Sequence, residues 1–153
     1  MSVQSRLIEI YSEVIVNRMG HDIHVWDDAL VFHPSEGWTL CIPMHPRDPE
    51  FFVLYASFPK PDATVDHAEL LAICSEAGKD LRLTRIDVTR EDVVLFSTHM
   101  LVAAPDSLPD PDYLHDILPQ TIGVLMAGAM HVMTEILSAE ILAANDCGES
   151  ESD

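Results

Sequence analysis

Residues 29–58 read ALVFHPSEGWTLCIPMHPRDPEFFVLYASF. This stretch contains apolar runs rich in β-branched and aromatic residues, separated by turns that contain proline and glycine. The runs are Ala29–His33, Trp38–Met44 and Phe51–Phe58. Because short loops join antiparallel neighbours, the stretch predicts an antiparallel meander of three strands. His24–Trp26 extends the first strand in this interpretation, although Asp27 and Asp28 interrupt its alternation.

The segments on either side of the meander have helical patterns. Apolar residues recur at helical spacing over Val3–Met19, and Gly20 provides a C-terminal stop. After the meander, either Thr64 or Asp66 is expected to cap a second helix. That helix ends near Gly78.

Two further strands are expected at Leu81–Val88 and Val93–Ala103, separated by a polar turn. The predicted order is therefore α-β-β-β-α-β-β-α, once the closing helical region is added. Strands that are grouped, instead of alternating with helices, favour an α+β fold with an antiparallel sheet over a Rossmann-like parallel one.

The closing region begins with a strong helix start at Asp110-Pro111-Asp112, which combines an acidic cap with proline at the first helical position. Pro119 is expected to kink or break this helix. A long helix is then predicted from Gln120 to Ala144. Residues 1–145 are thus expected to form a single domain, and residues 146–153 an acidic, disordered tail.

Charge excludes several kinds of partner. The chain has 153 residues with Lys+Arg 8 and Asp+Glu 26, a formal net charge of −18, and no cation follows Arg90. Such a chain repels phosphate backbones and anionic lipids, so neither a nucleic acid nor a membrane surface is expected as a partner. We expect no signal peptide, and the apolar stretch Ile122–Met133 is shorter than the ~20 residues of a membrane span. Three widely spaced cysteines favour the reducing cytoplasm.

The element order resembles the YbjN-like family, whose members are bacterial proteins often labelled as proposed sensory transduction regulators. The matching segments are Leu7–Gly20, Gly37–Phe58, Ala68–Cys74, Leu81–Val102 and Leu108–Leu137. The resemblance implies a fold related to type III secretion chaperones and a homodimeric, non-enzymatic interaction module. One departure is Ser75–Gly78, where family members often have an asparagine-containing segment, so the role of that segment is not carried over.

Histidines offer the main alternative, a small metal-dependent or histidine-assisted enzyme. His21 and His24 lie among carboxylates and would be metal ligands, but on extended chain residues three apart point to opposite faces. His131 and Glu135 are four apart on the last helix and would form a base–carboxylate pair. In both places the simpler interpretation is structural, and no cofactor, metal site or catalytic residue is assigned.

A basic cluster stands out in this acidic chain. Half of the cations lie within one short segment: Lys79, Arg82, Arg85 and Arg90. One interpretation is a patch for an anion or an acidic partner. The simpler one is solubilising charge paired with neighbouring acids, namely Glu76, Asp80, Asp87 and Glu91.

The last helix has more apolar surface than one sheet can cover, since its apolar residues occupy more than one stripe. Methionines give part of this surface a soft, adaptable character. We therefore predict a cytoplasmic protein-interaction module, regulatory or chaperone-like, that binds a second copy of itself and a protein client. The predicted interface residues are Met126, Met130, Met133 and Leu137.

Overall fold

An antiparallel sheet with the strand order β1-β2-β3-β4-β6-β5 forms the centre of the computed structural model, which describes residues 1–59 and 65–150. Within these residues the sheet has six strands, and the α+β class predicted from the sequence is confirmed. The elements are α1 (Val3–Ser12), η1 (Glu13–Arg18), β1 (Ile23–Trp26), β2 (Ala29–Phe32), β3 (Leu40–Pro43), β4 (Phe51–Pro59), α2 (His67–Gly78), β5 (Arg85–Val88), β6 (Val93–Leu101) and α3 (Pro111–Ser150).

β1 is a separate strand, and the prediction that His24–Trp26 extends the next strand was wrong. Trp26 pairs with Ala29, so Asp27-Asp28 is a two-residue turn between antiparallel strands. Asp27 has a φ of 51°, in the left-handed region that aspartate tolerates better than most residues. The two acids that interrupted the alternation are thus the turn of a hairpin.

The second hairpin is shorter than predicted. β5 begins at Arg85 instead of Leu81, because Lys79 to Leu81 continue from α2 in successive backbone turns. Leu83, with a φ of 64°, then reverses the chain ahead of the strand. β6 ends at Leu101, two residues before the predicted end at Ala103.

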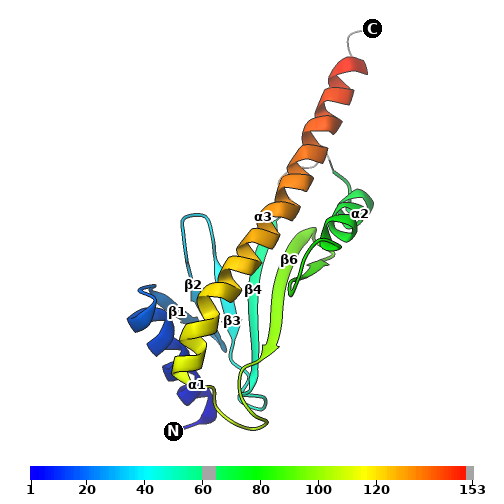
Figure 1. Cartoon of the computed structure of the whole chain (residues 1–153). Helices are drawn as coiled ribbons and strands as arrows, with labels where there is room; N and C mark the ends of the chain where they lie inside the picture. The colour runs from blue at the N-terminus through cyan, green and yellow to red at the C-terminus, as the bar shows by residue number, and fades with distance from the viewer. Residues whose placement is uncertain (60–64, 151–153) are drawn as a thin grey trace.

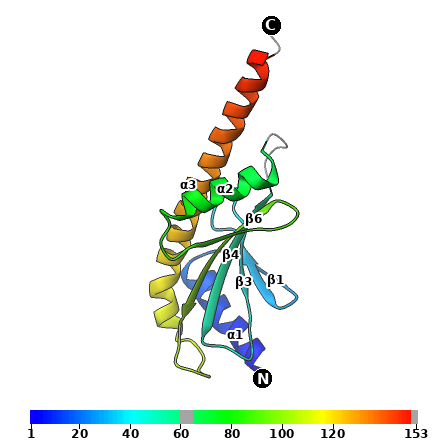
Figure 2. The same cartoon turned by 90° about the vertical axis from the view of Figure 1, so that its right-hand side faces the viewer.

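All the described helices pack on one face of the sheet (Figure 1). Alternate residues of β4 and β6, such as Leu54 and Phe96, point into this core. From α1, Tyr11 stacks on Phe52 with ring centroids 6.0 Å apart. From α2, Gly78 lies against the side chain of Ile86 on the same face. Figure 2 shows the strands with α1 behind them.

The helix starts follow the caps predicted from the sequence. Asp66 accepts a hydrogen bond from the backbone N–H of Glu69 (2.8 Å) at the start of α2, whereas Thr64 lies outside the described residues. Asp110 accepts one from the N–H of Asp112 (2.9 Å) at the start of α3. The first helical region continues from α1 into the π-helical η1 and ends before Gly20, whose φ is +78°.

Pro119 was expected to kink or break the closing helix; α3 is one continuous helix, so the chain does not break there. Leu114 and Leu118 before this proline and Ile122 after it are buried in the core, and this packing anchors the helix on both sides of Pro119. The helix also continues through residues 146–150, which were predicted to belong to a disordered tail; residues 151–153 lie outside the described residues. Its 40 residues span about 60 Å. The nine residues of β4 span only about 30 Å.

Replacing Pro119 should stabilise the protein. Proline lacks the N–H that would bond to the carbonyl of His115, a loss worth about 3 kcal/mol in a helix interior. Pro119→Ala also gives the unfolded chain more freedom, which offsets up to about 1 kcal/mol. We therefore expect the free energy of unfolding, measured by urea denaturation, to rise by about 1–2 kcal/mol. The control Gln120→Ala should change it by less than about 0.5 kcal/mol. An unchanged or lower stability of Pro119→Ala would contradict this account.

Candidate functional site

The predicted interface residues share one face of α3. Met126, Met130, Met133 and Leu137 fall within an arc of about 60° at 3.6 residues per turn. Met130 and Leu137 are 55% and 49% exposed, whereas Met126 and Met133 are partly buried against the core. The face therefore has an outer edge that is open to solvent and an inner edge that belongs to the domain. Whether it is an interface stays a prediction.

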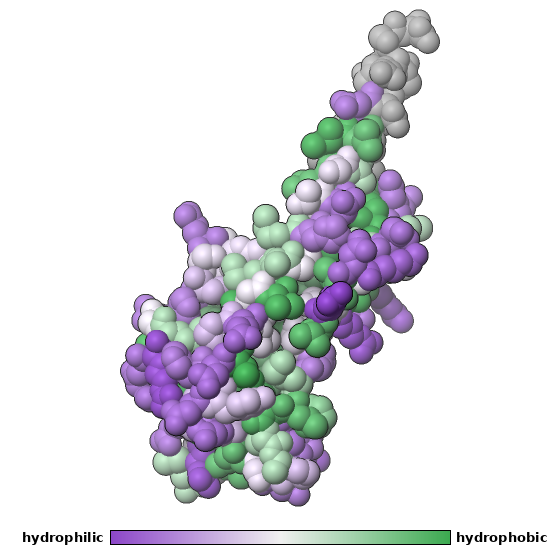
Figure 3. All heavy atoms as spheres, viewed as in Figure 1, coloured by the Kyte–Doolittle hydropathy of each residue, from purple (hydrophilic) through white to green (hydrophobic). Residues whose placement is uncertain are grey.

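The exposed edge continues along α3 beyond the sheet. Ile141 lies eleven residues after Met130, on the same side of the helix, and both Ile141 and Leu142 are exposed. In Figure 1 this half of α3 projects past the strands. Figure 3 shows apolar residues following α3 across the molecule, with hydrophilic residues on either side. We call the exposed side chains Met130, Leu137 and Ile141 the outer stripe of α3.

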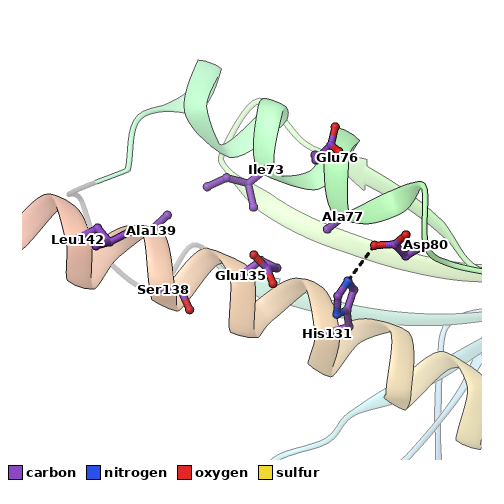
Figure 4. A pocket seen from close by; sticks show the side chains of 9 residues that line it. All are labelled: Ile73, Glu76, Ala77, Asp80, His131, Glu135, Ser138, Ala139 and Leu142. Carbon is purple, nitrogen blue, oxygen red and sulfur yellow. Dashed lines mark ion pairs between the residues drawn. The ribbon is translucent and has the colours of Figure 1, made fainter.

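A hollow of about 390 Å³ lies between α2 and α3 (Figure 4). Its apolar lining includes Ile73 and Ala139, and its polar lining includes His131, Asp80 and Glu135. His131 was expected to pair with Glu135. Its Nε2 instead lies 3.6 Å from Asp80 Oδ2, in the turn after α2, and both side chains are exposed. An exposed pair at this distance contributes little to stability.

His21 and His24 are not grouped with further metal-ligand side chains in the described residues. His24 lies on β1, whereas His21 precedes the strand and its ring lies 6.1 Å from that of Phe32. Over residues 1–59 and 65–150, no group of three or more His, Cys, Asp and Glu side chains is placed to hold a metal ion. The alternative of a metal-dependent enzyme that uses His21 and His24 therefore gains no support from the geometry.

The basic cluster is partly neutralised by its neighbours, as the simpler interpretation predicted. Lys79 donates to Glu76 (2.7 Å), and Arg85 Nε lies 3.3 Å from Asp87 Oδ2. Arg82 does not lie on a strand, because β5 begins at Arg85. The cluster therefore does not present its cations together on one strand.

The two described cysteines are poorly placed for nucleophilic chemistry. Cys41 is half-buried on β3 and Cys74 is buried in α2. Burial raises the pKa of both thiols above the ordinary value, which lowers the fraction of reactive thiolate. Both cysteines therefore fit structural positions.

By length and composition, the helical segment Pro111–Leu142 is long and apolar enough to cross a membrane. The sequence analysis considered only the shorter apolar stretch Ile122–Met133 and did not predict this. Core helices of globular domains pass the same test, so length and composition alone are weak grounds. The buried share of the most apolar window is 33%. Leu114, Leu125 and Ile136 are among the core residues that α3 contributes.

A second apolar surface, missed by the sequence analysis, is the face of the sheet opposite the helices. Phe51, Tyr55 and Leu101 point to this face from β4 and β6, and Trp26 points to it from β1. Trp26 and Leu101 are 69% and 61% exposed. A signal was present in the sequence: Phe51–Leu54 is a continuous apolar run, which is typical of a strand covered on both faces.

The fold thus defines an α+β protein with a six-stranded antiparallel sheet and helices on one face. No protein-family model and no curated protein matches the chain. Among solved structures, it is similar to an uncharacterized protein from Methanothermobacter thermautotrophicus, with a TM-score of 0.62 and 11% identity over 87% of this chain and 98% of that chain. At this identity the likeness shows a common fold.

The chain is also similar to YbjN from E. coli, described as a proposed transcription regulator. The TM-score is 0.49 and the identity 13%, with 90% of each chain covered. YbjN is the protein after which the family that the element order resembles is named, and this likeness concerns only the arrangement of the helices and strands.

Thiol labelling tests the placement of Cys74. This side chain is 5% exposed, and burial raises its pKa. We expect iodoacetamide at about pH 8 to label Cys74 of the native protein at least about tenfold more slowly than that of the denatured protein. Peptide mapping by mass spectrometry gives the rate at each cysteine separately, and Cys74→Ser confirms the assignment. Equal rates in the native and denatured protein would show that Cys74 is accessible.

Proposed function

We propose that this chain is a non-enzymatic protein-interaction module that forms a homodimer, with a regulatory or chaperone-like role in the cytoplasm. The observation that carries the proposal is the outer stripe of α3. Met130 and Leu137 are about half exposed, and they share one face of α3 with Met126 and Met133, which pack against the core. Apolar side chains that extend in a line beyond the domain core are typical of a surface that meets a partner.

The geometry of α3 supports self-association through this stripe. The helix is about twice as long as the strands it packs on, so its C-terminal half has little sheet to cover it. Two copies of one stripe, related by a two-fold axis, form a self-complementary contact. The partly buried Met126 and Met133 lie beside the stripe and would adapt their conformations to a partner.

Charge supports the same choice of surface. The chain carries −18, so two copies repel each other over most of their surfaces. The acidic residues of α3 nearest the stripe are Glu135, which lines the hollow beside α2, and the buried Glu140. A contact along the stripe therefore brings few carboxylates together, and the acidic surface elsewhere keeps the assembly soluble.

The competing proposal of an enzyme has no site to carry it in the described part of the chain. His131 is exposed beside Asp80, and the hydroxyl that lines the hollow around it, that of Ser138, donates to the backbone carbonyl of Thr134 (2.9 Å) and not to a base. We therefore assign His131 no catalytic role.

Substitutions on the outer stripe test the dimer. At tens of micromolar, light scattering after size-exclusion chromatography should give a mass about twice 17.0 kDa. Leu137→Asp and Met130→Asp place a carboxylate in the contact, so we expect each dissociation constant to rise about a hundredfold, equivalent to about 2.8 kcal/mol.

Gln120→Asp is the matched control, because it adds the same charge to an exposed position of α3 away from the stripe. This variant should remain as dimeric as the parent protein. A parent protein of 17.0 kDa at every concentration would refute the dimer. A dimer that withstands both stripe substitutions would place the contact on another surface.

A further inference from the structure

The second surface of interest is the open face of the sheet, defined here by the residues of β2, β3, β4 and β6 that point away from the helices. The register places Val31 opposite Cys41, Cys41 opposite Tyr55 and Tyr55 opposite Ser97, so these side chains form one row across the sheet. A second row begins with Phe51 opposite Leu101. A sheet with apolar residues on both faces is normally covered on both.

None of the residues that β2, β3, β4 and β6 place on this face is a carboxylate, whereas β5 adds Arg85 opposite Ser97 and Asp87 opposite Leu95. Its residues are Ala29, Val31, Cys41, Pro43, Phe51, Val53, Tyr55, Ser57, Pro59, Val93, Leu95, Ser97, His99 and Leu101. The chain has Asp+Glu 26 in 153 residues, so the acidic residues are concentrated elsewhere. At one margin of the open face Asp27 and Asp28 form the turn beside β2. At the other margin, on β5, Asp87 is paired with Arg85, whose Nε lies 3.3 Å from Asp87 Oδ2. The surface is thus apolar in the middle and acidic at the margin of the Asp27-Asp28 turn.

A hollow of about 410 Å³ lies at one margin of the open face. Trp26, Val31 and Cys41 supply apolar lining, and Asp27 and Asp28 also line the hollow. Asp28 accepts a hydrogen bond from Gln4 (2.7 Å), whereas Asp27 has no hydrogen bond or ion pair among the described residues. An apolar wall beside a carboxylate suits the side chain of lysine or arginine, which has an apolar stem and a charged end.

We propose that the open face binds an amphipathic helix of another protein, with its apolar side on the sheet and lysine or arginine beside the Asp27-Asp28 turn. A helix is favoured over an added strand because the edge strands β1 and β5 have only four residues each. The proposal rests on the proposed function, because it names the class of client that the interaction module binds.

Charge excludes the occupants that this chain itself offers. The residues after Arg90 contain no lysine or arginine, so the C-terminal segment would bring carboxylates to Asp27 and Asp28. A second copy has the same acidic turn and the same net charge of −18, so two open faces packed together would bring two strongly acidic chains into contact. A partner with basic margins meets the opposite charge.

The test uses synthetic 18-residue peptides and isothermal titration calorimetry with the full chain. The first peptide has leucine at helical spacing and lysine elsewhere; the second replaces lysine by glutamate; the third has the first composition in a scrambled order without an apolar side. We expect the first peptide to bind at least about tenfold more tightly than either control, because only it has both the apolar side and the basic margins.

Variants locate the binding site. Trp26→Ala removes an exposed apolar side chain, and Asp27→Asn with Asp28→Asn removes both turn charges while retaining a residue type that tolerates a positive φ. Each should weaken binding of the first peptide about tenfold. Leu71→Ala, which removes an exposed apolar side chain from α2 on the helical side of the molecule, is the matched control and should bind the peptide as the parent does. Circular dichroism verifies that every variant is folded.

Three results would overturn the proposal: no binding of the first peptide, equal binding of the scrambled peptide, or unchanged binding by Trp26→Ala. A fourth would be loss of the dimer in Trp26→Ala, since a second copy would then cover the open face. The peptide titration is repeated with Leu137→Asp. Peptide binding by a monomeric Leu137→Asp supports both proposals, whereas a dimer that binds no peptide refutes only this one.

Discussion

The one-sided packing of helices on the sheet governs the rest of the structure. Leu114 and Leu125 from α3, Tyr11 from α1 and Leu70 from α2 all enter one core, on the face of the sheet lined by Phe96. Burial of such side chains is worth about 1.5–3 kcal/mol each. Because every described helix contributes to this core, no described helix covers the opposite face, and several of its apolar residues, such as Trp26, Phe51 and Leu101, stay exposed to solvent, although Val53 is buried.

This packing explains which parts of the fold could be predicted. Local chemistry was sufficient for the caps at Asp66 and Asp110 and for the turns of the meander, because each depends on residues a few positions apart. The hairpin at Asp27 and the continuity of α3 through Pro119 were not predicted. In both cases distant contacts decide the outcome: the pairing of β1 with β2, and the buried leucines around Pro119.

The two candidate surfaces also differ in whether local spacing or distant contacts determine them. Helical spacing alone places Met126, Met130, Met133 and Leu137 on one face, since the period of a helix is fixed. The open face could not be assembled in the same way, because the rows across the sheet depend on the register between strands that are distant in sequence, such as β4 and β6. The pairing of His131 with Asp80, not Glu135, also required the packing of α2 against α3.

The distribution of charge connects the two apolar surfaces. A net charge of −18 opposes any contact that brings two carboxylate-rich surfaces together, so the surfaces without carboxylates are the ones on which close contacts cost least. The outer stripe of α3 is linear and is not bordered by carboxylates. Two identical stripes can therefore pack together with little repulsion. The open face is broad and bordered at one margin by Asp27 and Asp28, which suits a basic partner better than a second copy of the same net charge. The proposed self-association and the proposed client binding thus use different sides of the sheet, and the same acidity is the physical argument for both.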